Sequence, residues 1–221
     1  MQAPFTALLF DMDGLMIDTE SVSGDAWRLA AEEVGQPIDE ALILGMVGLS
    51  VHKCVDFIAG HFQDRSLAET LSASCRRHYR RLLAHGELRV KPGIFDVLQW
   101  AEDTVLPRAV ATSTQRELCD LKLARTGLQR FFRHTVAGDE VANTKPAPDI
   151  YLAAAALLDV APAQCVVLED SVYGVRAAQA AGMRVIMVPD ILTPTSEDSA
   201  GTLAVCRDLH EALPLLKQLR G

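Results

Sequence analysis

The chain lacks the cysteine and histidine patterns that bind metal or form disulfides. Its five cysteines are an odd number, widely scattered and without a Cys-x-x-Cys pair, which favours reduced, mostly buried thiols over a disulfide framework. Its six histidines include no His-x-His and no His-Glu-x-x-His arrangement. A zinc site is therefore not expected.

Long apolar runs are also missing. No apolar stretch approaches the ~18 residues that a membrane helix needs. The first ten residues carry no basic segment ahead of an apolar one, as a signal peptide would. We therefore expect no membrane partner and a cytoplasmic protein.

Basic residues are in the minority, with 21 Lys and Arg against 29 Asp and Glu and a net charge of −8. A nucleic-acid partner would want a basic face, so this class is disfavoured, whereas a local pocket can still bind a small anion. The 221 residues are 49% apolar and 23% charged, which is ordinary for a globular protein with a sizeable core. The length fits one large domain, or one domain with a smaller insertion.

Short apolar runs that end in polar residues recur along the chain. Runs of this kind fit strands buried on both faces of a parallel sheet. The predicted strands are Ala7–Phe10, Ala109–Thr112, Thr135–Ala137, Cys165–Leu168 and Arg184–Val188. Helical stretches closed by glycine lie between them, for example 115–126 before Gly127 and 173–181 before Gly182. The alternation predicts an α/β fold with a doubly wound parallel sheet.

Residues 20–87 break this alternation, because they have few strand-like runs and much helical periodicity. Ser66 and Glu69 are spaced as in a capping box and predict a helix from there to Leu83. We expect an inserted all-helical cap of the four-helix type, within an α/β core formed by residues 1–19 and 88–221.

Polar residues that could take part in catalysis or metal binding follow four of the predicted strands. They are Asp11 and Asp13 after the first strand, Thr112, Ser113 and Thr114 after the second, Lys145 in the loop after the third, and Glu169 and Asp170 after the fourth. The carboxyl ends of parallel strands line one crevice. These side chains are therefore expected to converge at one edge of the sheet.

Such a cluster favours phosphoryl transfer. Crowded carboxylates repel one another unless a cation neutralises them, and oxygen-only ligands point to Mg²⁺. An aspartate in line with phosphorus can attack it and form an aspartyl-phosphate. The aspartate two residues on can protonate the leaving alcohol and then activate water. A lysine and a hydroxyl suit the remaining phosphoryl oxygens, so the expected partner is a small phosphorylated metabolite.

The motifs Asp11-Met-Asp13-Gly, Thr112, Lys145-Pro and Glu169-Asp170 occur in the order of the four motifs of the haloacid dehalogenase superfamily. The chain resembles this superfamily over nearly its whole length. The resemblance is closest to the phosphatase and β-phosphoglucomutase-like branch, in which a helical cap follows the first motif.

The resemblance implies a role for each motif residue. Asp11 would be the nucleophile and Asp13 the general acid and base, while Thr112 and Lys145 would hold the phosphoryl group, with Lys145 also restraining the Asp11 charge. The implied ligands of Mg²⁺ are Asp11, the backbone carbonyl of Asp13, Asp170, and Glu169 either directly or through water.

Two departures from the mutase pattern favour hydrolysis of a phosphomonoester. Ser23 stands where mutases carry a cap histidine, and residues 49–53 after Gly48 contain no arginine, although His52 or Lys53 could take its place. A β-phosphoglucomutase-like phosphomutase stays open as the alternative. A receiver-like phosphoacceptor domain is the alternative of another class, disfavoured by the length and the large insertion. Retention of Asp13 and Asp170 disfavours a dehalogenase.

Substrate specificity is expected to come from the cap and the rim of the site. The candidate cap and rim residues are Ser23, Gly48, Leu49, Ser50, Lys91 and Arg116. Of these, Gly48 and Arg116 are predicted to bind substrate together with Thr112, Ser113 and Lys145, although Arg116 fits a solvent-facing helical position equally well. The predicted substrate is a sugar phosphate or a nucleoside monophosphate, and the chain is expected to be a monomer or a weak dimer.

Overall fold

The computed structural model describes residues 4–221 and divides the chain into two units. The α/β unit comprises the residues up to Asp18 together with Arg89–Gly221, and the helical unit is Thr19–Leu88. The role of the helical unit as a cap remains a prediction.

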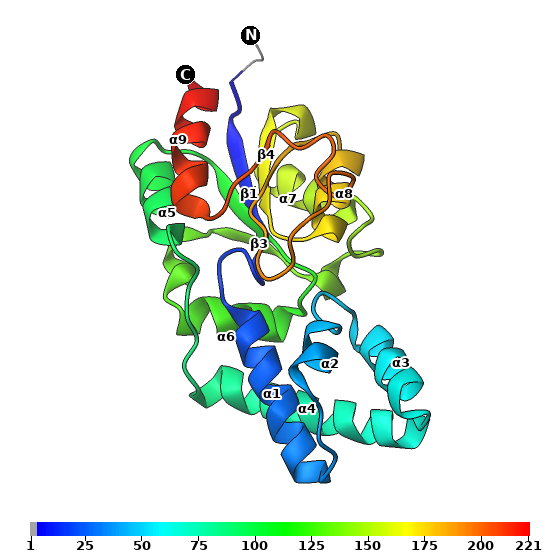
Figure 1. Cartoon of the computed structure of the whole chain (residues 1–221). Coiled ribbons are helices and arrows are strands. Elements are labelled where there is room, and N and C mark those ends of the chain that lie inside the picture. Colours follow the sequence, from blue (N-terminus) through cyan, green and yellow to red (C-terminus); the bar gives the residue numbers. More distant parts are fainter. Residues whose placement is uncertain (1–3) are drawn as a thin grey trace. The chain divides into compact units, whose positions relative to one another are not determined.

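A parallel sheet with the strand order β3-β2-β1-β4-β5-β6 forms the centre of the α/β unit (Figure 1). The strands are β1 (Ala7–Phe10), β2 (Arg108–Ala111), β3 (His134–Val136), β4 (Cys165–Glu169), β5 (Arg184–Met187) and β6 (Ala204–Val205). β1 is central, and its Leu9 is paired in register with Ala109 of β2 and Val167 of β4. The predicted α/β class is confirmed. The short β6 was not predicted, since two residues carry too little pattern.

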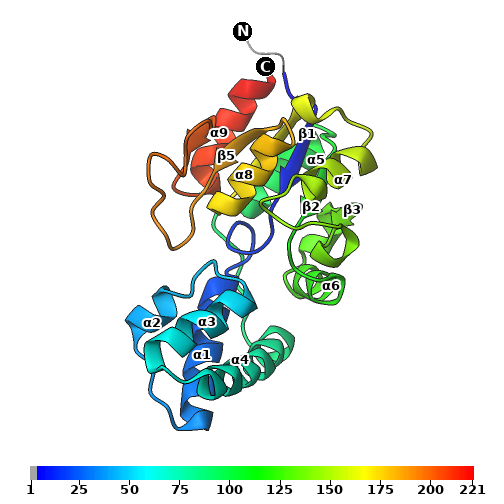
Figure 2. The same cartoon turned by 90° about the vertical axis from the view of Figure 1, so that its right-hand side faces the viewer.

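Helices cover both faces of this sheet (Figures 1 and 2). They are α5 (Ile94–Asp103), α6 (Arg116–Arg125), α7 (Asp149–Leu157), α8 (Val172–Ala180) and α9 (Leu209–Arg220), with short 3-10 turns η1 (Leu128–Phe131), η2 (Gly138–Glu140) and η3 (Pro162–Gln164). The side chains of Ala7 and Leu9 pack in one cluster with Ile150 and Tyr151 of α7 and Val175 of α8. α5 and α9 pack against each other. Burial on both faces explains why the central strands are uniformly apolar.

The sheet ladder continues past the strand ends and fixes the first polar residues there. The backbone N–H of Asp11 donates to the carbonyl of Leu168 at 3.0 Å, and that of Thr112 donates to the carbonyl of Val136 at 3.0 Å. Asp11 and Thr112 are therefore held by the sheet itself rather than by mobile loops.

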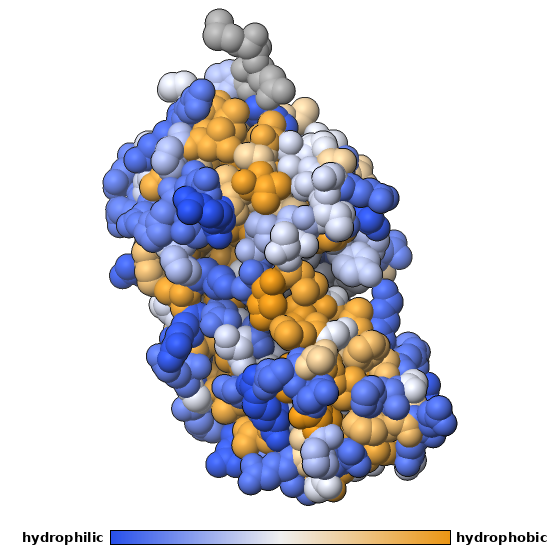
Figure 3. Space-filling view, viewed as in Figure 1, coloured by the Kyte–Doolittle hydropathy of each residue, from blue (hydrophilic) through white to orange (hydrophobic). Residues whose placement is uncertain are grey.

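The helical unit contains α1 (Thr19–Val34), α2 (Glu40–Leu44), α3 (Val51–Phe62) and α4 (Arg65–His85). α4 packs against both α1 and α3, around a core that includes Trp27, Ile58 and Leu71. Apolar side chains also reach the surface of this unit, as the orange patches in Figure 3 show, and Leu44 and Val51 are about half exposed.

The predicted capping box at the start of α4 is wrong. Asp64 is the N-cap, and its carboxylate accepts from the backbone N–H of Leu67 at 3.0 Å. Ser66 lies inside the first turn. Asp and Ser are both good N-caps, so local sequence did not decide between the two starting points.

The cysteines are buried, as their scatter along the sequence predicts. All five cysteines are buried and free, and burial raises the pKa of Cys75 and Cys119 to about 12. Among residues 4–221, no helix has the length and apolar character needed to cross a membrane.

Candidate active site

Asp11 and Lys145 form an ion pair at the carboxyl edge of the sheet. The Nζ of Lys145 lies 2.5 Å from Oδ1 of Asp11, although the two residues are 134 positions apart. Their side chains are 9% and 6% exposed, so the pair is almost completely removed from water. Burial raises the pKa of Asp11 to about 7; Lys145 opposes this shift, while Glu169 and Asp13 add to it.

Glu169 holds Lys145 from the other side and is itself held rigidly. Its Oε1 accepts from Lys145 at 2.5 Å and from the hydroxyl of Tyr151 at 2.9 Å. Its Oε2 accepts from the backbone N–H and the hydroxyl of Ser171, at 2.8 and 3.0 Å. Both oxygens of this fully buried carboxylate therefore have two donors each, which favours an indirect rather than a direct role in binding a metal.

Glycines make room for these carboxylates. A Cβ on Gly174, in the first turn of α8, would lie 1.7 Å from Oε1 of Glu169. A Cβ on Gly14, where φ is +82°, would lie 2.3 Å from Oδ2 of Asp170. The glycine after the first motif thus allows the β1 loop to approach Asp170.

Asp11, Glu169 and Asp170 form a possible metal site, because one oxygen from each lies within 4.8 Å of the others. Burial raises the pKa of Asp170 well above its usual range, and the neighbouring carboxylates of Glu169 and Asp11 raise it further. A cation among them would relieve this repulsion. The donor set contains only oxygen and fits a hard cation such as Mg²⁺.

The segment after β2 surrounds Asp13. Thr114 donates from Oγ1 to Oδ2 of Asp13 at 2.6 Å, and Thr112 donates to the same oxygen at 3.3 Å. The hydroxyl of Thr112 also accepts from the backbone N–H of Thr114 at 3.1 Å. The structure therefore brings the predicted Asp13 and Thr112 together, as it does Asp11, Lys145 and Glu169.

Arg116 is not part of this cluster. Its guanidinium donates to Glu140 at 2.5 and 3.0 Å, to Asp120 at 3.0 Å and to the hydroxyl of Thr135 at 2.5 Å. These partners tie the start of α6 to β3 and η2. Arg116 thus has structural partners, and its predicted contact with substrate stays a prediction.

Ser113 is exposed, and its backbone packs against Gly138, where a Cβ would lie 2.2 Å from the Ser113 carbonyl oxygen. Lys91 forms an ion pair at 2.5 Å with Asp190, which follows β5. Its ammonium group is thus engaged by a carboxylate of the same unit.

The other predicted rim residues belong to the helical unit. Ser50 is the N-cap of α3, with its hydroxyl accepting from the backbone N–H of Lys53 at 3.4 Å, and Gly48 has a φ of +74°. Ser23 lies within α1 and Leu49 packs against the core of the unit.

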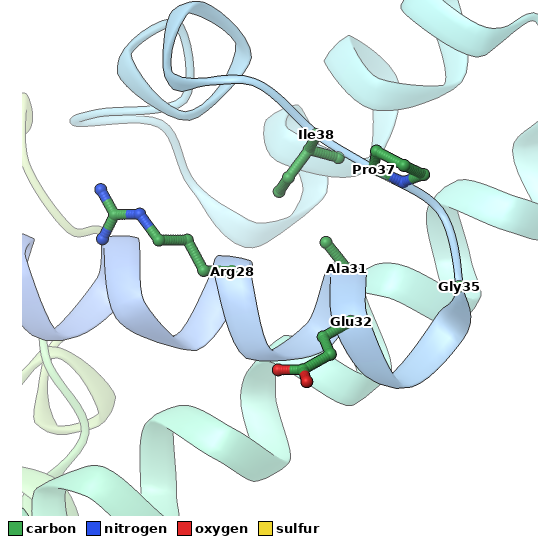
Figure 4. Close-up of a pocket in the computed structure, with 6 residues that line it drawn as sticks. All are labelled: Arg28, Ala31, Glu32, Gly35, Pro37 and Ile38. Carbon is green, nitrogen blue, oxygen red and sulfur yellow. The ribbon is translucent and has the colours of Figure 1, made fainter.

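A pocket of about 290 Å³ also lies in the helical unit, between α1 and the segment that follows it (Figure 4). It is lined by Arg28, Ala31, Glu32, Gly35, Pro37 and Ile38. Arg28 is paired with Glu40 and Asp25 at 2.8 Å, so the one cation there already has carboxylate partners. This pocket lacks the nucleophile and metal ligands of the carboxylate cluster.

Three residues of the site were not predicted from the sequence. Tyr151 supports Glu169, and its ring lies 4.9 Å from the Nζ of Lys145. Lys122 of α6 lies 2.5 Å from Asp13. Asp190 follows β5 at the same sheet edge as the other carboxylates, which is the one sequence signal that was available for any of the three.

Comparison with known proteins decides the family. The model of the haloacid dehalogenase-like hydrolases matches residues 8–188. The chain belongs to this family. It is 32% identical to the phosphorylated carbohydrates phosphatase of Thermotoga maritima, over 96% of this chain and 99% of that one. It is also 32% identical to the fructose-1-phosphate phosphatase YqaB of Escherichia coli K12, over 85% and 98% of the two chains.

The fold of this haloacid dehalogenase-like hydrolase is also found among solved structures. The crystal structure of a Thermotoga maritima protein assigned as a beta-phosphoglucomutase matches with a TM-score of 0.82 and 31% identity, covering 96% of this chain and 98% of that one. The predicted family is confirmed. The predicted enzyme class, a phosphatase, is confirmed by the family match and by the phosphatases among the relatives.

Proposed function

We propose that the chain is a Mg²⁺-dependent phosphomonoester hydrolase that acts through an aspartyl-phosphate on Asp11. The observation that carries the proposal is the arrangement around Asp11, whose carboxylate lies 2.5 Å from Lys145 and within 4.8 Å of oxygens from Glu169 and Asp170. A nucleophilic carboxylate beside a buried cation and a possible metal site suits attack on a phosphoryl group.

The side chains divide the work of the reaction. Asp11 supplies the attacking oxygen, and Lys145 attracts the phosphoryl oxygens while Glu169 and Tyr151 keep it in place. Thr112, buried at the end of β2, offers a hydroxyl to the same group. Positioning and charge neutralisation of this kind supply most of the catalysis in phosphoryl transfer.

Asp11, Asp170 and the backbone carbonyl of Asp13 are the proposed ligands of Mg²⁺, with Glu169 acting through water. When bound, the cation neutralises the carboxylates and polarises a phosphoryl oxygen. Asp13 gives a proton to the leaving alcohol and then takes one from the water that cleaves the aspartyl-phosphate.

The proposed substrate is a small phosphorylated metabolite, either a sugar phosphate or a nucleoside monophosphate. Two relatives that match almost their full length are named as phosphatases of phosphorylated carbohydrates and of fructose 1-phosphate. We also propose that the enzyme works in the cytoplasm as a monomer or weak dimer, without nucleic acid or membrane. The net charge of −8 supports the proposal that nucleic acid is not a partner.

The test is phosphate release from a panel of sugar and nucleoside monophosphates, measured with Mg²⁺ and again with a chelator. We expect release that requires Mg²⁺ and is lost in Asp11→Asn, which also controls for a contaminating phosphatase. Full activity of Asp11→Asn would show that the nucleophile is assigned wrongly. An isomerised sugar phosphate in the same samples, without release, would instead establish a mutase.

A further inference from the structure

Lys122 occupies a position where the helix would ordinarily place an apolar residue. It lies on the inner face of α6 next to Cys119 and Leu123, and all three residues are at most 2% exposed. Lysines are almost never fully buried unless they are paired. The burial of Lys122 therefore calls for an explanation in terms of a partner.

One carboxylate partner of Lys122 is Asp13. The Nζ of Lys122 lies 2.5 Å from Oδ1 of Asp13 and 3.3 Å from Oγ1 of Thr114. The hydroxyl of Thr114 donates to the other carboxylate oxygen, Oδ2, at 2.6 Å. Because each oxygen of Asp13 has its own donor, the plane of the carboxyl group is fixed and not only its position.

We propose that Lys122 is a positioning residue, which holds the Asp13 carboxyl group in the orientation for proton exchange with the leaving-group oxygen. This inference rests on the proposed function, since it concerns the reaction in which Asp13 serves. Lys122 acts through Asp13 and through the Thr114 hydroxyl that both residues share.

The step in which Lys122 acts is the formation of the aspartyl-phosphate. A bond forms between a carboxylate oxygen of Asp11 and phosphorus, and the bond from phosphorus to the leaving oxygen breaks. The proton of Asp13 moves to that oxygen, and the ammonium group of Lys122 balances the carboxylate that remains. A leaving group that is already a stable anion does not need this proton, so the contribution of Lys122 should increase with the basicity of the leaving group.

The experiment compares kcat/KM for an aryl and an alkyl phosphate, p-nitrophenyl phosphate and glycerol phosphate, in the presence of Mg²⁺. For each ester, kcat/KM depends only on the steps up to release of the alcohol. For Lys122→Met, we expect kcat/KM to fall at least about 10-fold more with the alkyl than with the aryl ester. Lys217→Met, in which an exposed lysine of α9 is lost, should leave both values unchanged.

Equal losses with the two esters, or no loss, would overturn the proposal, because a purely structural role of Lys122 does not depend on the leaving group. Circular dichroism checks the fold of each variant. If Lys122→Met does not fold, Lys122→Gln and Thr114→Val carry the test, and the same selective loss is expected of both.

Wild type and Asp13→Asn separate this inference from the proposed function. If wild type hydrolyses neither of these esters nor any sugar or nucleoside monophosphate of the panel, the proposed function is wrong. If Asp13→Asn shows the selective loss with the alkyl ester and the Lys122 and Thr114 variants do not, only the role of Lys122 is wrong.

Discussion

At the scale of single residues, the site depends on how tightly Glu169 is held. Its carboxylate accepts four hydrogen bonds and in turn fixes Lys145 beside Asp11. The first turn of α8 passes so close that the position of the carboxylate requires glycine at 174. This close approach makes a small substitution outside the reacting groups informative.

Gly174→Ala should lower the free energy of unfolding by about 2 to 4 kcal/mol, because the added methyl group overlaps Glu169 and forces it to give up hydrogen bonds. Phosphate release should fall as well, since Lys145 loses its support. Urea unfolding and the phosphate assay measure the two effects. The matched control is Gly60→Ala on the exposed side of α3, where a Cβ meets nothing within 4 Å. There we expect a gain of about 0.5 to 1 kcal/mol. Wild-type stability of Gly174→Ala would contradict the packing described for Glu169.

The residues that the sequence predicted and those it missed differ in how they are placed. Asp11 and Thr112 directly follow strands, and sheet topology alone brings strand ends to one edge. Lys122 and Tyr151 lie on helices, where whether a side chain faces the site depends on the angle and depth at which the helix packs. No local pattern separates Lys122 from an ordinary solvated lysine. Arg116 also lies on a helix, and the sequence could not predict its ion pair and hydrogen bond because the partners, on β3 and η2, are distant in sequence.

At the scale of elements, the first strand was predicted correctly, whereas the start of α4 was not. A strand buried on both faces is apolar throughout and ends where polar residues begin, so β1 was predicted with its observed bounds. A helix start depends on which of several polar residues caps it. At α4, Asp64 and Ser66 are both suitable, and the structure shows Asp64 in this role.

Asp64→Ala should therefore cost about 1 kcal/mol of stability, because the backbone N–H of Leu67 loses its acceptor at the end of the helix. Ser66→Ala should change the stability by no more than a few tenths of a kcal/mol, since alanine suits a position within the first turn. Thermal unfolding of the two variants beside wild type makes the comparison. A larger loss for Ser66→Ala than for Asp64→Ala would restore the capping box predicted from the sequence.

At the scale of the whole molecule, crowding of carboxylates at one sheet edge links stability to pH and to the metal. In the metal-free protein, burial raises the pKa of Asp11 from 3.8 to about 7 and that of Asp170 well above its usual range. At pH values between the pKa of these carboxyl groups in the unfolded chain and their pKa in the native protein, the native state therefore binds more protons than the unfolded state. The stabilisation is complete below the pKa of the unfolded chain and is lost as the pH rises through about 7.

We therefore expect the free energy of unfolding of the metal-free protein to fall, relative to that of Asp11→Asn, by on the order of 2 kcal/mol between pH 5 and pH 8. The variant lacks the titrating carboxyl group but keeps all six histidines, so the difference between the two curves cancels their titration. Urea unfolding in the presence of a chelator measures both proteins across this range. Added Mg²⁺ should return stability to wild type at pH 8, and should do so less in Asp11→Asn, because a cation offsets the repulsion that deprotonation creates. A difference between the two proteins that does not vary with pH would show that Asp11 keeps an ordinary pKa, and that the carboxylate cluster is stable without a cation.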